Sequence, residues 1–101
     1  MQGNQQDIVP VKAMFFIDFW NYELTMKALD PAFLTNWFAL PPVITREISR
    51  LLGMPVQYER CFIFGSYDPN APGDIKLQNW AKNVLPNIPG ALVNFFPDKN
   101  A

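Results

Sequence analysis

The chain has 101 residues, of which 50% are hydrophobic and 15% aromatic, and its formal net charge is -1. This composition excludes a disordered chain and a strongly basic nucleic-acid-binding domain, and it predicts one small domain with a hydrophobic core. Histidine is absent, which excludes histidine bases and histidine metal ligands. The apolar runs are too short to cross a membrane, and the single cysteine, Cys61, is expected to be a buried apolar residue in a reducing compartment. We therefore expect a cytoplasmic protein.

The N-terminal half begins with a flexible lead-in over residues 1–10, followed by a predicted strand over Val11–Trp20. The continuous apolar character of this strand is typical of a parallel sheet that helices cover on both faces. A short helix is expected over Asn21–Leu29. Asp30-Pro31 then resembles an N-cap with proline at the first helical position, which predicts a further helix through Leu40.

The C-terminal half continues the alternation of helices and strands. This alternation predicts the α/β class, with a short, mostly parallel three-stranded sheet flanked by helices and joined by right-handed crossovers. One domain would span residues 11–97, before a short tail over residues 98–101. The expected elements are a helix over Pro42–Leu52, a strand over Val56–Phe64, a loop over Gly65–Gly73, a helix from Asp74 to Leu85 and a strand over Ala91–Phe96.

Asp18 is the only charge in the apolar run from Ala13 to Trp20, and Asn21 follows it three residues later. An ionised carboxylate inside an apolar segment is costly unless other groups compensate it. The carboxyl ends of parallel strands are where open α/β sheets bind ligands, so Asp18 and Asn21 are predicted to lie at a functional site. The alternative is that Asp18 only caps the following helix, with Asn21 in its first turn.

Three features together resemble the first half of an NYN domain, a branch of the PIN-like metal-dependent ribonucleases. They are Phe16-Ile-Asp-Phe-Trp-Asn21, the helix before Gly53, and Phe64-Gly-Ser-Tyr-Asp-Pro69. The resemblance covers nearly the whole chain and implies a Rossmann-like half-domain that hydrolyses RNA with bound Mg²⁺ or Mn²⁺. It also implies that Asp18 is the catalytic residue and metal ligand, and that Asn21 and Ser66 contact the substrate.

The later acidic residues of the NYN family have no counterpart here, and the sequence ends at Ala101, where the second half of such a domain would begin. One aspartate alone holds Mg²⁺ weakly, so we expect a truncated domain that is weak or inactive by itself. A further possibility is that the sequence is an excised or prematurely ended piece of a longer enzyme. The alternative in function is a non-catalytic interaction or assembly module with the same fold. In either case the first strand would form an exposed sheet edge, which a second copy of the chain or a separate partner is expected to cover.

Other candidate residues each have a functional and a structural interpretation. Ser66 fits a turn better than a nucleophile, because no histidine or lysine base lies near it in the sequence. Asp68 either forms an Asx turn before Pro69 or supplies a second metal ligand. Aromatic side chains could stack on RNA bases or pack in the core; these are Trp20, Tyr22, Trp37 and Tyr67.

Overall fold

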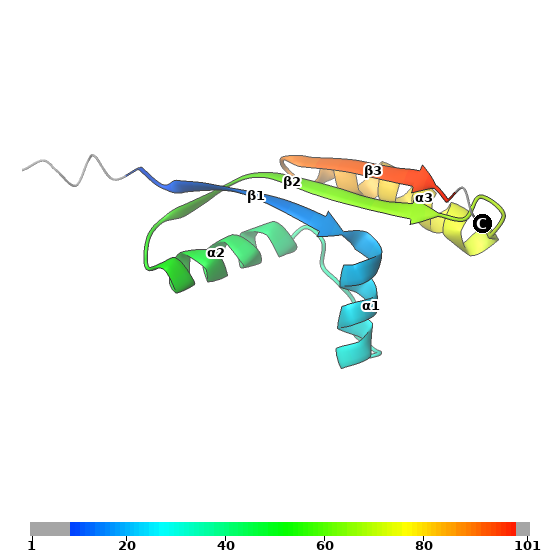
Figure 1. Cartoon of the computed structure of the whole chain (residues 1–101), viewed down its shortest axis with the longest axis horizontal. Helices are drawn as coiled ribbons and strands as arrows, with labels where there is room; N and C mark the ends of the chain where they lie inside the picture. The colour runs from blue at the N-terminus through cyan, green and yellow to red at the C-terminus, as the bar shows by residue number, and fades with distance from the viewer. Residues whose placement is uncertain (1–8, 99–101) are drawn as a thin grey trace, which may run out of the picture.

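The computed structural model describes residues 9–98, so most of the predicted lead-in and tail lie outside the described residues. Three parallel strands form one sheet in the order β1-β2-β3, accompanied by three α-helices (Figure 1). The predicted α/β class and the edge position of the first strand are confirmed. The elements are β1 (Val11–Asp18), α1 (Phe19–Leu29), α2 (Leu40–Leu52), β2 (Val56–Tyr67), α3 (Pro72–Val84), the 3-10 helix η2 (Leu85–Asn87) and β3 (Ala91–Pro97).

The first strand ends two residues earlier than predicted. Phe19 and Trp20 belong to α1, because the Asp18 side chain caps the helix and so fixes its start. Phe19 is 2% exposed, and its ring stacks on that of Trp37 with 5.3 Å between centroids. An apolar side chain is buried equally well at the end of a strand or the start of a helix, so the apolar run alone does not mark this boundary.

The prediction of a helix from Asp30-Pro31 through Leu40 is wrong. The Asp30 backbone N–H donates to the Met26 carbonyl at 3.0 Å, which closes α1. The Asp30 side chain accepts from the Ala32 N–H at 3.1 Å, the pattern of an Asx turn. Asp30 therefore ends one helix instead of starting another, and the next helix begins only at Leu40.

The hydrophobic core lies between one face of the sheet and the helices. Alternate residues of each strand point to this face, so Phe15, Ile17 and Ile63 are each at most 9% exposed. Leu85 is fully buried against the same cluster. In Figure 1, α1 and α2 lie below the strands and α3 lies behind them. Within the described residues no helix is long and apolar enough to cross a membrane.

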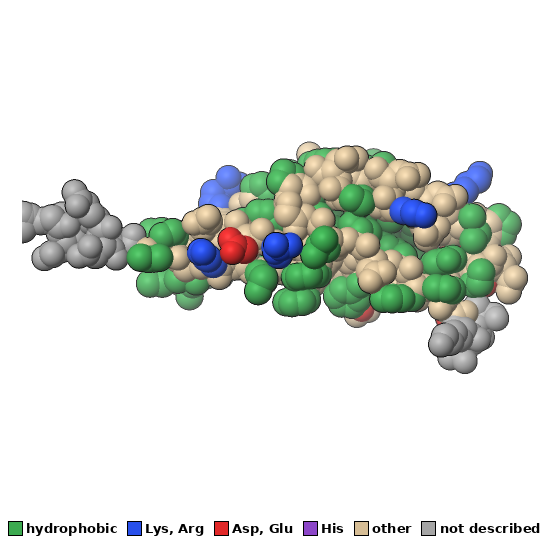
Figure 2. Space-filling view, turned by 90° about the horizontal axis from the view of Figure 1, so that it is seen from above, with side chains coloured by type: hydrophobic (Ala, Val, Ile, Leu, Met, Phe, Trp, Pro, Cys, Tyr) green, Lys and Arg blue, Asp and Glu red, His purple; other side chains and the backbone are tan. Residues whose placement is uncertain are grey.

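The opposite face of the sheet differs from the expectation that helices cover both faces. Phe16 is 69% exposed and its ring stacks on that of Phe62 with 4.9 Å between centroids. Figure 2 views the molecule from above the strands and shows hydrophobic side chains over much of that surface. We call the outward-pointing set of large apolar side chains the apolar face; it consists of Met14, Phe16, Phe62, Phe64, Leu92 and Phe96.

A bulge interrupts the pairing of β1 with β2. Ala13 pairs with Tyr58, but Met14 pairs with Arg60, so β2 has one residue more than β1 at this point. Glu59 and Arg60 are consequently both exposed. The residues on either side of them, Tyr58 and Cys61, both point towards the core, although they lie three positions apart.

Cys61 is fully buried, as predicted, and burial raises the pKa of its thiol from an ordinary value of 9.0 to about 11. Because the folded pKa exceeds the unfolded one, the stabilisation linked to the protonated thiol is complete below pH 9 and is lost between pH 9 and 11. We expect the advantage of the native chain over Cys61→Ala in free energy of unfolding to shrink across this window. Denaturant titrations at several pH values measure it, and a constant difference would contradict the prediction.

Candidate functional site

Asp18 lies at the carboxyl end of β1 and is the N-cap of α1. Its Oδ1 accepts a hydrogen bond from the Asn21 backbone N–H at 3.2 Å, and its Oδ2 accepts one from Asn21 Nδ2 at 2.9 Å. The backbone of Asp18 is extended, with φ -76° and ψ 109°, as is usual for an N-cap. The two residues predicted to share a site are therefore in direct contact. Their contact also has the form of the capping alternative.

Ser66 lies on β2, two residues beyond Phe64, the neighbour of Asp18 in the sheet. Its backbone carbonyl accepts a hydrogen bond from Trp20 Nε1 at 2.6 Å. Among the described residues no hydrogen bond joins the Ser66 side chain to Asp18 or Asn21. The structure thus brings Asp18 and Asn21 together and connects Ser66 to this end of the sheet through Trp20.

An open hollow with a volume of about 360 Å³ lies beside Asp18 and Asn21. Tyr22 and Thr25 of α1 line it together with Phe16 of β1. Asp18 is the only charged group in this lining, so the hollow contains neither a second carboxylate nor a cation that could hold a phosphate. It offers room for a ligand but few groups to orient one.

The described residues contain no group of three acidic or cysteine side chains that could together hold a metal ion. Asp68, considered as a second ligand, instead accepts a hydrogen bond from the Asn70 N–H at 2.8 Å, which confirms the predicted Asx turn. The Asp68 backbone N–H donates to Asp74 Oδ2 at 2.9 Å, so both carboxylates organise the loop before α3. Asp18 with Asn21 does not by itself fit the several oxygen ligands that Mg²⁺ requires.

Three of the four aromatic residues considered for base stacking, Trp20, Tyr22 and Trp37, pack against other aromatic rings. Trp37 is 5% exposed and contacts Phe19 and Tyr22. The Trp20 ring meets that of Phe19 edge to face, with 5.4 Å between centroids. The packing interpretation is therefore correct for Trp37, and both Trp20 and Tyr22 adjoin the same core.

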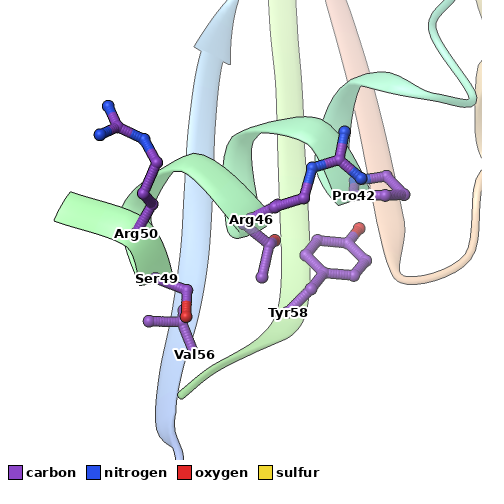
Figure 3. Close-up of a pocket in the computed structure, with 7 residues that line it drawn as sticks. Pro42, Arg46, Ser49, Arg50, Val56 and Tyr58 are labelled. Atoms are coloured by element: carbon purple, nitrogen blue, oxygen red, sulfur yellow. The ribbon is translucent and has the colours of Figure 1, made fainter. Parts of the chain in front are cut away.

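A larger hollow that sequence reasoning missed, of about 640 Å³, lies between α2 and β2 (Figure 3). Arg46 and Arg50, one helical turn apart on α2, line it with Tyr58, and this spacing is the signal that could have indicated it. Arg50 forms an ion pair with Glu47, which holds the pKa of that carboxyl below its ordinary value. The Tyr58 hydroxyl donates to the Pro89 carbonyl at 2.6 Å, and burial raises its pKa. Arg50 and Tyr58 therefore already have partners within the fold.

Three comparisons with known proteins, against family models, curated proteins and solved structures, returned no match.

The capping role of Asp18 makes a testable prediction. Asp18→Ala removes both hydrogen bonds to Asn21 and should lower the free energy of unfolding by about 0.5–2 kcal/mol. Asp18→Asn should lose much less, because asparagine caps helices about as well as aspartate. Urea unfolding of the two variants measures the difference. Equal losses would mean that the charge, and not the cap, supplies the stability.

Proposed function

We propose that this chain is a protein-assembly module whose apolar face binds an amphipathic helix of a partner protein. The observation that carries the proposal is the exposure of large apolar side chains on one face of a parallel sheet. Phe16 is 69% exposed, Phe96 55% and Leu92 49%. Parallel sheets in known folds are covered on both faces, and exposed apolar patches of this kind mark interaction surfaces.

The shape and chemistry of the apolar face favour a helix as the bound element. A hollow of about 510 Å³ runs across all three strands, between side chains such as Phe16, Phe62 and Leu92. Asn94 is the only polar residue in its lining, and no charged residue contributes to it. Helices cover the other face of this sheet, and an apolar helix stripe is the usual complement of such a surface.

A photo-crosslinking experiment tests the proposal. A benzophenone amino acid is placed at position 96 on the apolar face, or at position 52 at the end of α2, where Leu52 is also 55% exposed. We expect a protein adduct from position 96 that position 52 does not give. The purified partner should then bind Phe96→Asp about tenfold or more weakly than the native chain, and bind Leu52→Asp normally. Equal cross-linking from both positions, or equal loss in both variants, would overturn the proposal.

A second candidate function is the metal-dependent cleavage of RNA implied by the resemblance to NYN domains. The observation in its favour is the hollow beside Asp18 and Asn21 at the carboxyl end of β1. In this candidate, Asp18 would hold Mg²⁺ or Mn²⁺, Asn21 and Ser66 would contact RNA, and the remaining acidic ligands would come from outside these 101 residues. We derive no catalytic step from a single carboxylate.

Cleavage of single-stranded RNA in a Mn²⁺ titration separates the two candidates. The assembly module predicts the same background cleavage for the native chain and Asp18→Asn, a variant that keeps the helix cap. Metal-dependent cleavage that Asp18→Asn abolishes would contradict the assembly module and support the nuclease.

A further inference from the structure

Alternate residues of β1 direct their backbone N–H and C=O groups to the free edge of the sheet. The Val11 N–H donates to the Pro55 carbonyl at 3.0 Å, so Val11 faces β2. Backbone N–H and C=O groups alternate in direction along a strand. Those of Lys12, Met14 and Phe16 therefore point away from β2, to the side on which the described residues place no further strand. This edge offers regularly spaced donors and acceptors to another strand.

The side chains of β1 are arranged so that the strand complements itself. Lys12 and Asp18 each lie three residues from Phe15, on opposite sides of it, and alternation along β1 places both on the side of the sheet that carries the apolar face. Within its own copy Lys12 lies 4.0 Å from Glu59, and the Asp18 carboxylate accepts from Asn21. If a second β1 runs antiparallel about a two-fold axis at Phe15, Lys12 lies opposite Asp18 of the second copy. Met14 then lies opposite Phe16 of that copy. Opposite charges and apolar pairs directly across a strand pair are both stabilising.

Other antiparallel registers lack this complementarity. With the axis at Met14, Lys12 would lie opposite the apolar Phe16 of the second copy. With the axis at Phe16, Asp18 would lie opposite Met14. Only the axis at Phe15 places Lys12 opposite Asp18 of the second copy. In this register the backbone N–H and C=O groups of Lys12, Met14 and Phe16 also face those of the second strand. A two-fold axis also makes the contact self-limiting, because the same edge serves both copies.

We propose that two copies of this chain pair through β1 in this register and form one continuous six-stranded sheet. The apolar faces of the two copies then adjoin and make one extended surface. The proposal rests on the proposed function in that this doubled surface is what a partner protein would bind. It adds the identity of the occupant of the β1 edge, a second copy of the chain.

Cysteine cross-linking tests the register. In the proposed pairing the Cα atoms of residue 14 and residue 16 of the second copy are about 5.5 Å apart, within disulfide range. The Cα atoms of residue 14 in the two copies form a diagonal pair beyond about 7 Å apart, which is too far for a disulfide. Mixing Met14→Cys with Phe16→Cys under oxidation should therefore give a disulfide-linked dimer, whereas neither variant should cross-link with itself. Both native side chains are exposed, so the core is undisturbed, and Cys61 is buried.

A charge variant tests the same pairing without cross-linking. Lys12→Asp places two like charges opposite each other twice per dimer, and should raise the dimer dissociation constant about 2- to 30-fold in sedimentation equilibrium. Lys76→Asp, an equal charge change on the exposed surface of α3, should leave it unchanged.

Three results would overturn the dimer. They are a native chain that sediments as a monomer at high concentration, self-cross-linking of either cysteine variant in place of the mixed product, and equal effects of Lys12→Asp and Lys76→Asp. None of them affects the cross-linking from position 96, because β3 lies at the other edge of the sheet. Failure of the dimer and failure of the assembly module are thus distinguishable.

Discussion

Replacing Phe19 by alanine is expected to lower the free energy of unfolding by about 3–5 kcal/mol, comparable with the whole stability of many small domains. Phe19 is 2% exposed and its ring contacts those of Trp20, Trp37 and Phe95. These contacts join α1, the loop before α2 and β3. Truncating the ring leaves a cavity at the point where three parts of the chain meet, so the structure cannot easily collapse to fill it.

Phe16→Ala is the matched control for this prediction. Phe16 lies three residues earlier but is 69% exposed, and its main ring contact is with Phe62 on the apolar face. We expect a loss below about 1 kcal/mol, because little apolar surface leaves the core. Denaturant titration of both variants provides the comparison. Similar losses in the two would mean that the apolar face is covered in solution and that Phe16 is buried there.

Gly90→Ala should also be strongly destabilising, by about 2–4 kcal/mol, for two independent reasons. Gly90 has a φ of +77°, which disfavours any residue with a Cβ. A Cβ there would lie 2.9 Å from the Glu59 carbonyl oxygen and 3.0 Å from the Tyr58 hydroxyl oxygen. The backbone contact cannot relax by a change of rotamer, so the turn before β3 would have to move.

Gly53→Ala separates the two causes. Gly53 also has a positive φ, +67°, but a Cβ there would meet no atom within 4 Å. Gly53→Ala should lower the free energy of unfolding only by the cost of a positive φ for alanine, about 1–2 kcal/mol. Thermal or urea unfolding of the two variants should rank Gly90→Ala as clearly worse. The same loss in both would show that steric contact at Gly90 contributes nothing.

Much of the fold could be predicted from the sequence because local signals and tertiary structure agree. The helix over Pro42–Leu52 was marked by an apolar stripe and a following glycine, and α2 ends as expected at Gly53 in the left-handed conformation. Asp30-Pro31 misled because aspartate serves both helix starts and turns after helices. The Asp30 N–H to Met26 bond decides between them, and composition does not encode it.

The apolar face was not predicted, for a different physical reason. A strand with hydrophobic residues on both sides is typical of a sheet that is buried on both faces. That pattern shows that each side chain prefers an apolar environment. It does not show whether a helix of the same chain or another molecule provides that environment. Phe15 and Phe16 are adjacent and identical in type, yet one is 9% exposed and the other 69%. The helices of this chain decide which of the two is covered.

For the candidate site, sequence reasoning located the contact between Asp18 and Asn21 but not its chemical character. A three-residue separation allows both a shared ligand site and a capped helix start, since in both cases the Asp18 carboxylate lies beside Asn21. The distinction depends on groups from distant parts of the chain. The carboxylates of Asp68 and Asp74 accept hydrogen bonds from backbone N–H groups of the loop before α3. Among the described residues they form no metal-binding group with Asp18.

The bulge at Glu59 and Arg60 has a consequence for how the length of this chain can change. Strict alternation would place Tyr58 and Cys61 on opposite sides, and one additional residue keeps both inward. A chain lacking Arg60 would run in uninterrupted alternation and still present the same inward side chains. A single-residue deletion elsewhere in β2 would place inward side chains outward, and outward ones inward, over part of the strand. The segment at the bulge is therefore the point of β2 where a deletion of one residue leaves the inward side chains in place.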